Sequence, residues 1–114
     1  MRLSHINLTV TDVPAAKAFL SEYFELEDQG GNAGMGFLFD DQGMVVSLMK
    51  AGRGGVEYPP TFHIGFFIEG RETVDALHAR LIAAGHDAPA PEDNGHAYGF
   101  YVQAPGGFTV EVGA

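Results

Sequence analysis

Two similar stretches limit the folds that this chain can adopt. Residues 4–10 read SHINLTV, and residues 62–68 read FHIGFFI. Each stretch carries a His-Ile pair near its start and continues in residues typical of strands. A polar break and an amphipathic helix pattern then follow in both cases. The chain is therefore predicted to contain one small unit twice, with His5 and His63 at equivalent positions.

The first half, residues 1–50, is predicted to run strand, helix, strand and hairpin. Pro14 fits the first turn of a helix that ends near Phe24, because proline lacks an N–H that would be unpaired there. Phe37 and Phe39 share one face of a strand, and we interpret both as core residues. The strands of this half are expected at residues 5–10, 26–29, 35–39 and 44–50.

The second half, residues 61–114, repeats this order after a linker at residues 51–60. The linker holds three glycines and a Pro-Pro pair, and Tyr58 within it is expected in a solvent loop. The helix of the second half is predicted to bury Ile82 in its apolar stripe and to end at Gly85. Strands are expected at residues 61–68, 98–103 and 108–112, with a polar loop at residues 92–96.

Composition excludes several classes of function. A length of 114 residues fits one domain, and the formal charge of -9 argues against nucleic acid or an anionic membrane as the partner. The same charge favours a cationic small molecule. Cysteine is absent, so histidine and carboxylate side chains must hold any metal ion. The chain lacks a signal-peptide pattern and long apolar runs, which predicts a cytoplasmic protein.

The matched positions of the two halves predict a metal centre. The last strand of each half has a central polar residue, which is Ser47 in the first half and Glu111 in the second. Two imidazoles and one carboxylate can hold a divalent ion and leave positions open for substrate. We therefore predict that His5, His63 and Glu111 bind Mn, Fe, Zn or Ni. The alternative is that each histidine merely begins a strand and that the glutamate faces solvent.

Three stretches of the chain resemble the vicinal oxygen chelate superfamily, which includes glyoxalase I, bleomycin-resistance proteins, extradiol dioxygenases and fosfomycin-resistance thiol transferases. They are residues 3–12, 62–66 and 104–112. The resemblance implies an α+β fold in which two paired βαβββ modules form curved mixed sheets. It also implies a homodimer with sites shared between subunits. His5 would then come from one module, and His63 and Glu111 from the facing module.

The resemblance also suggests the type of activity. Glyoxalases commonly have a fourth ligand, often Glu, where this chain has Ser47, so the chain looks more like the three-ligand members. We expect a divalent-metal enzyme that acts on a small oxygen-bearing substrate by dioxygenase, lyase or thiol-transferase chemistry. The alternative is a non-catalytic, drug-binding dimer like the bleomycin-resistance proteins. His96, Tyr98 and Tyr101 are candidates for the acid, the base or a substrate clamp, and a surface role is the alternative for His96.

Overall fold

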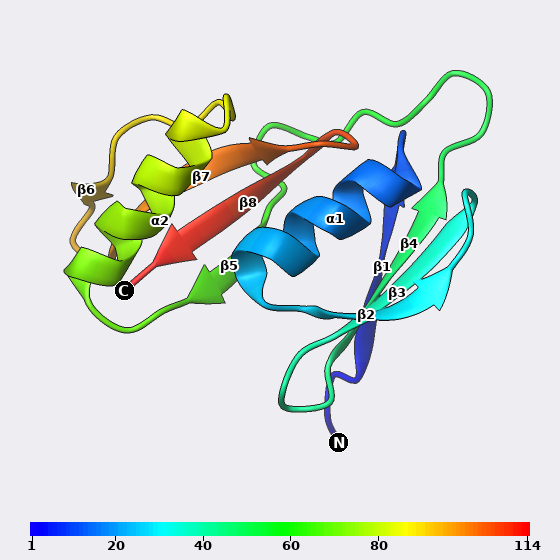
Figure 1. Cartoon of the computed structure of the whole chain (residues 1–114), viewed down its shortest axis with the longest axis horizontal. Coiled ribbons are helices and arrows are strands. Elements are labelled where there is room, and N and C mark those ends of the chain that lie inside the picture. Colours follow the sequence, from blue (N-terminus) through cyan, green and yellow to red (C-terminus); the bar gives the residue numbers. More distant parts are fainter. The chain divides into compact units, whose positions relative to one another are not determined.

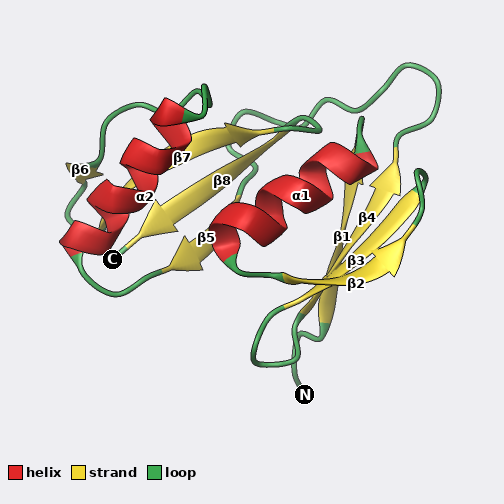
Figure 2. Cartoon of the chain, viewed as in Figure 1, coloured by secondary structure: helices red, strands yellow, loops and turns green.

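The computed structural model describes residues Met1–Ala114, which form eight strands and two helices. The strands make two four-stranded sheets. The chain divides into two compact units, Met1–Tyr58 with Pro105–Gly107 and Pro59–Ala104 with Phe108–Ala114. Each unit has one helix against one sheet (Figures 1 and 2). The predicted α+β fold of two βαβββ modules is confirmed, and the assignment of residues 51–60 as a linker stays a prediction.

Unit 1 pairs its first strand with its last. Its elements are β1 (His5–Val10), α1 (Val13–Phe24), β2 (Glu27–Gly31), β3 (Met35–Phe39) and β4 (Val45–Lys50). The sheet order is β1-β4-β3-β2, with β1 parallel to β4 and the other pairs antiparallel. A parallel pair needs a long crossover connection. The helix α1 and the β2–β3 strands supply that connection.

Local sequence signals determine where helix α1 begins and ends. The side chain of Asp12 accepts a hydrogen bond from the Ala15 N–H at 3.1 Å and caps the helix. Glu25 ends it in the left-handed conformation, with φ of 58°. The apolar stripe of the helix is buried and covers one face of the sheet. This stripe consists of Val13, Ala16, Phe19, Leu20 and Phe24.

The opposite face of this sheet is not part of the core. Phe37 and Phe39 are 36% and 38% exposed, so their prediction as core residues is wrong. They alternate along β3 with Leu38, which is fully buried, and therefore point away from α1. Period-two alternation predicted that the two rings share a face, but it did not say which face the helix covers.

Tyr58 is not in a solvent loop, contrary to the prediction. Its hydroxyl donates to the Thr9 carbonyl oxygen and accepts from the Thr9 N–H, both at 2.8 Å. These two bonds occupy the open edge of β1, whose other edge pairs with β4. The end of the first unit is thereby held against its first strand.

Unit 2 repeats the topology of unit 1. Its elements are β5 (Ile64–Phe67), α2 (Arg71–Ala83), β6 (Glu92–Asp93), β7 (Tyr98–Ala104) and β8 (Phe108–Gly113). The sheet order is β5-β8-β7-β6, with β5 parallel to β8. Two predictions here need correction. The first strand begins at Ile64, so His63 precedes it, and the expected loop at residues 92–96 contains the short strand β6.

The helix α2 ends as predicted but buries a narrower stripe. Gly85 has φ of 88°, and the His86 N–H that follows donates to the Leu81 carbonyl at 3.0 Å. Val74, Leu77 and Leu81 are buried, whereas Ile82 is 45% exposed. Ile82 lies eight positions after Val74, about 80° around the helix, and so falls at the edge of the stripe. Neither helix of the chain is long and apolar enough to cross a membrane.

Candidate metal and substrate site

Glu111 lies in the middle of β8 and faces away from α2. Its neighbours Val110 and Val112 are fully buried, and the Glu111 side chain is 29% exposed. In register, Glu111 is opposite Gly65 on β5 and Tyr101 on β7. Strand alternation thus brings the carboxylate to the open face of the sheet, where it is not forced into the apolar core.

His63 reaches this carboxylate from the residue before β5. Its Nε2 lies 2.9 Å from the Glu111 Oε2, and its Nδ1 lies 3.0 Å from the Thr61 carbonyl oxygen. A carbonyl oxygen only accepts, so Nδ1 carries the hydrogen. In the neutral ring, Nε2 then presents a lone pair to the carboxylate. A positive charge, from a second ring proton or from a metal ion, makes this contact favourable.

The donor set of His63 and Glu111 fits a divalent metal ion. Ligand atoms about 2.1 Å from an ion and at right angles to each other are about 3.0 Å apart. The observed separation of 2.9 Å is that of an ordinary ion pair or hydrogen bond, and it is also compatible with this spacing. A backbone carbonyl that holds the other ring nitrogen is also the usual support of a metal-binding histidine. Imidazole with carboxylate suits Mn, Fe, Zn or Ni.

The third predicted ligand, His5, belongs to unit 1. It lies exposed at the start of β1, with Nδ1 3.0 Å from the Ser4 Oγ. Ser47 lies opposite Asn7 and donates to the Asn7 Oδ1 at 2.9 Å. Within the chain, no three His, Asp or Glu side chains are grouped so as to hold a metal ion. The structure therefore brings two of the three predicted ligands together, His63 and Glu111.

Tyr101 is the one predicted catalytic candidate on the face of Glu111. Its ring meets the His63 ring edge-on, with centroids 5.4 Å apart and planes at 83°. Tyr101 is 43% exposed, so its hydroxyl is accessible to a bound molecule. His96 is exposed in the loop that follows β6, where its N–H donates to the Asn94 Oδ1 at 3.0 Å.

Tyr98 points to the other face of the sheet. Its hydroxyl donates to the Asp75 carboxylate of α2 at 2.6 Å, and the Arg71 guanidinium lies 4.7 Å from the ring centroid. The hydrogen bond to Asp75 raises the pKa of the Tyr98 hydroxyl above its ordinary value. Tyr98 therefore joins helix to sheet on the side opposite Glu111.

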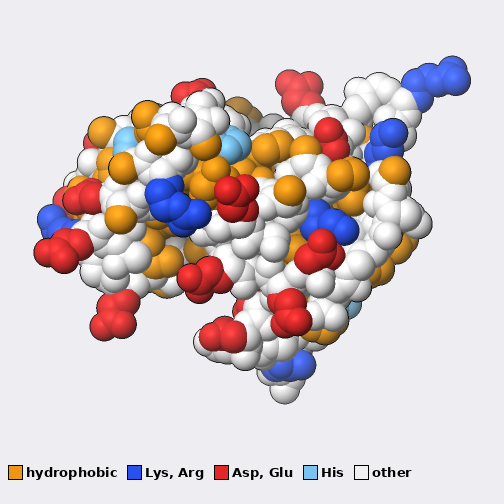
Figure 3. Space-filling view, viewed as in Figure 1, with side chains coloured by type: hydrophobic (Ala, Val, Ile, Leu, Met, Phe, Trp, Pro, Cys, Tyr) orange, Lys and Arg blue, Asp and Glu red, His pale blue; other side chains and the backbone are white.

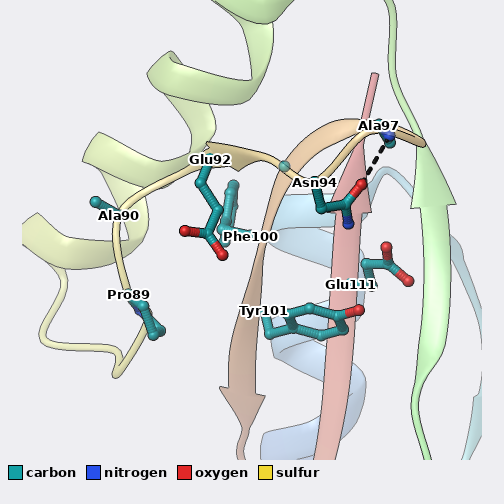
Figure 4. Close-up of a pocket in the computed structure, with 9 residues that line it drawn as sticks. Pro89, Ala90, Glu92, Asn94, Ala97, Phe100, Tyr101 and Glu111 are labelled. Atoms are coloured by element: carbon teal, nitrogen blue, oxygen red, sulfur yellow. Dashed lines mark hydrogen bonds between the residues drawn. The ribbon is translucent and has the colours of Figure 1, made fainter.

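A hollow of about 160 Å³ in unit 2 adjoins Glu111. Its wall includes two polar residues that the sequence did not suggest, Glu92 and Asn94, together with Tyr101 (Figure 4). Gly99 also lines the hollow and contributes no side chain to fill it. The signal for these residues was their place in a polar segment beside a strand end, where loops often carry binding residues.

Comparisons with known proteins agree with the fold and the sequence motifs. The family model of the glyoxalase/bleomycin resistance protein/dioxygenase superfamily matches residues 2–112. A possible glyoxalase from Bacillus cereus is 44% identical, with a TM-score of 0.92, over 100% of this chain and 99% of that chain. The fosfomycin resistance protein FosX from Listeria monocytogenes is 26% identical, with a TM-score of 0.82, over 100% of this chain and 93% of that chain.

A mutant of the same FosX has been solved with Mn(II) and 1S,2S-dihydroxypropylphosphonic acid. It is 24% identical, with a TM-score of 0.82, over 99% of this chain and 91% of that chain, and it resembles this chain in fold. Among proteins of curated function, none matches significantly. The family model spans almost the whole chain. This chain therefore belongs to the glyoxalase/bleomycin resistance protein/dioxygenase superfamily.

Proposed function

We propose that this protein is a divalent-metal-dependent enzyme of the vicinal oxygen chelate type that acts on a small oxygen-bearing substrate. The observation that carries the proposal is the contact of 2.9 Å between the His63 Nε2 and the Glu111 Oε2, with the Thr61 carbonyl fixing the ring. The presence of Mn(II) in a FosX structure supports a divalent ion in this fold. His5 enters the proposal as the third ligand from the matched positions of the two halves in the sequence and from the family resemblance.

Each residue of the site has a distinct task in this proposal. The ion, when bound, supplies Lewis acidity to substrate oxygens and stabilises negative charge that develops on them. His63 and Glu111 hold the ion. The Thr61 carbonyl keeps the imidazole in the tautomer in which Nδ1 carries the hydrogen and Nε2 carries none. The Tyr101 hydroxyl, beside His63, is the group that donates a proton to a substrate oxygen or accepts one from it. These tasks are compatible with the dioxygenase, lyase and thiol-transferase chemistry that the family resemblance implies.

The test is metal content in matched variants. Protein prepared without a histidine tag is loaded with Mn²⁺ or Zn²⁺, dialysed and analysed for metal. We expect about one ion per chain in the wild type and loss of metal in His5→Ala, His63→Ala and Glu111→Ala. His96→Ala removes an exposed histidine outside the proposed set and keeps its metal. Unchanged metal content in all three ligand variants contradicts the proposal. Tight binding of a cationic drug by metal-free protein would instead identify a binder.

We also propose that the protein is a homodimer in which each site combines residues of both subunits, as the family resemblance implies. Mixing two defective variants tests this arrangement. If His5 and Glu111 of one site come from different subunits, mixed dimers of His5→Ala and Glu111→Ala contain one intact site. Metal binding then returns to about one quarter of the wild-type level after subunit exchange. If both ligands come from the same chain, mixing restores nothing.

A further inference from the structure

We infer that the hollow beside Glu111 binds the tail of the substrate, and that Glu92 selects tails that carry a positive charge or a hydrogen-bond donor. The inference rests on the proposed function, because it takes the oxygen-bearing head of the substrate to lie at Glu111. Glu111 stands at one end of the hollow, and Glu92 stands at the other with Pro89 and Ala90 (Figure 4). The two ends therefore contact different parts of one molecule.

The size of the hollow limits what it can take. Its volume is about 160 Å³, whereas sites for drug-sized ligands usually measure about 300 to 1,000 Å³. The hollow therefore accepts a small molecule or one arm of a larger one. Pro89, Ala90 and Ala97 give its wall an apolar part that suits a short hydrocarbon or an aromatic edge.

Asn94 supplies a hydrogen-bond donor in the middle of the hollow. Its Oδ1 accepts from the backbone N–H groups of His96 and Ala97, both at 3.0 Å. An amide has donors only on its nitrogen, so these two bonds fix which end of the side chain is which. The NH₂ group is then directed toward the side of Glu111 (Figure 4). It is placed to donate to an oxygen of the bound molecule.

Asp93, which lies between Glu92 and Asn94, makes two side-chain hydrogen bonds. Asp93 accepts from the Arg71 guanidinium at 2.5 Å and from the Gly95 N–H at 2.9 Å. The Gly95 N–H, followed by Arg71, lowers the pKa of Asp93 below its ordinary value. The same Arg71 lies over the Tyr98 ring. The charge of Asp93 is therefore paired with Arg71, on the side of α2.

The charge of Glu92 has no such partner. Its side chain takes part in none of the ion pairs of the chain, and no Lys, Arg or His lines the hollow. The net charge of -9 adds to the same negative potential, and acidic side chains are spread over the face shown in Figure 3. An ammonium or hydroxyl group on the tail gains an acceptor at Glu92. At the Glu92 end, away from the ion that Glu111 would hold, a carboxylate or phosphonate tail meets like charge.

Three catechols test this selectivity, because they share a metal-binding head and differ in the charge of the tail. Dopamine has an ammonium tail, methylcatechol a neutral tail and homoprotocatechuate a carboxylate tail. Dissociation constants are measured without oxygen on protein loaded with Zn²⁺, which has no redox chemistry. At low salt, we expect wild-type protein to bind dopamine about tenfold more tightly than homoprotocatechuate.

Glu92→Gln should reduce this ratio to about twofold, which leaves only the effect of the net charge. Glu72→Gln is the matched control, because it removes one exposed carboxylate from α2, on the other side of the sheet, and should keep the tenfold ratio. If the ratio of the two dissociation constants is the same in Glu92→Gln and in wild type, the inference is overturned. The proposed function still stands in that case if the protein binds Zn²⁺.

Failure of the proposed function gives a different result. If the protein binds no Zn²⁺, the same titrations are followed on metal-free protein through the side-chain NH₂ resonance of Asn94. A shift with dopamine that is lost in Glu92→Gln still supports selection of the tail by Glu92. A shift that is equal in both proteins, or no shift with any of the three probes, rejects it.

Discussion

Gly65 and Gly99 lie on the two strands that flank β8, and replacing each with alanine should separate folding from binding. Gly65 lies on β5 directly opposite Glu111, and Gly99 lies on β7 in the wall of the hollow. Neither glycine has a positive φ, so the backbone of both positions accepts an ordinary residue. The two positions therefore differ in the atoms that an added methyl group would contact.

At Gly99 the new carbon would lie 1.9 Å from the backbone carbonyl oxygen of Val112. A carbon and an oxygen need more than about 3 Å, so β7 and β8 must separate by over about 1 Å. That movement strains the pairing of Gly99 with Gly113 at the end of the sheet. Overpacking combined with weakened strand hydrogen bonds should cost about 3 kcal/mol of unfolding free energy.

At Gly65 the nearest atom to the new carbon is the Glu111 Oε2 at 3.8 Å, which is ordinary contact. Gly65→Ala should therefore keep the fold or gain up to about 1 kcal/mol, because alanine restricts the unfolded chain. The methyl group would lie beside the carboxylate that we propose as a metal ligand. Metal or substrate affinity should fall in this variant although its stability does not.

Urea unfolding followed by circular dichroism measures both effects, and metal titration separates them. Gly113→Ala is the control for an added methyl group in the same sheet, because its nearest contact is the Ala97 Cβ at 3.4 Å. Gly99→Ala should also melt on the order of 10 °C below wild type. Equal unfolding midpoints for Gly99→Ala and Gly113→Ala would refute the steric argument.

Three further outcomes are expected. Tyr58→Phe leaves the Thr9 backbone N–H and carbonyl without their hydroxyl partner. Urea unfolding should show an unfolding free energy lower by about 1 to 3 kcal/mol. A loss below about 0.5 kcal/mol would contradict this expectation. Asp75 raises the pKa of the Tyr98 hydroxyl above its ordinary value of 10.0. The contact therefore stabilises the fold fully at pH values below 10.0, and this stabilisation is lost as the pH rises through the higher pKa of the folded state. Ultraviolet titration of Asp75→Asn should show an earlier phenolate, and an unchanged titration would count against the contact. Mn²⁺ at about one hundred times its dissociation constant should raise the unfolding free energy by about 2.7 kcal/mol in wild type and should have no effect in Glu111→Gln.

Local signals in the sequence predicted the order of helices and strands, and the family resemblance supplied the pairing of the two modules. The proline and glycine at the ends of the helices, and the repeated strand pattern, each act over a few residues. The structure keeps both helix ends, but the first strand of unit 2 begins at Ile64 and β6 forms within the predicted loop. Which face of a strand is covered depends on packing across the sheet, so Phe37 and Phe39 were misplaced. The wall formed by Glu92 and Asn94 was missed for a related reason. Its strand β6 has two residues, which is too short to show any periodicity.

The register of the two sheets explains why a duplicated unit should contribute unequally to a site. Two residues after His5, Asn7 lies opposite Ser47, and two residues after His63, Gly65 lies opposite Glu111. These are the same positions of the two modules. In unit 1 the amide of Asn7 accepts the Ser47 hydroxyl at 2.9 Å, so the pair satisfies itself.

In unit 2 the residue opposite Glu111 has no side chain, and the carboxylate is left to meet His63 at 2.9 Å. The absence of a side chain at Gly65 therefore leaves the Glu111 carboxylate open to His63. Placing an asparagine at position 65 should recreate the pair of unit 1. The amide would then donate to the Glu111 carboxylate, compete with His63 for it and weaken metal binding without removing any of the three proposed ligands.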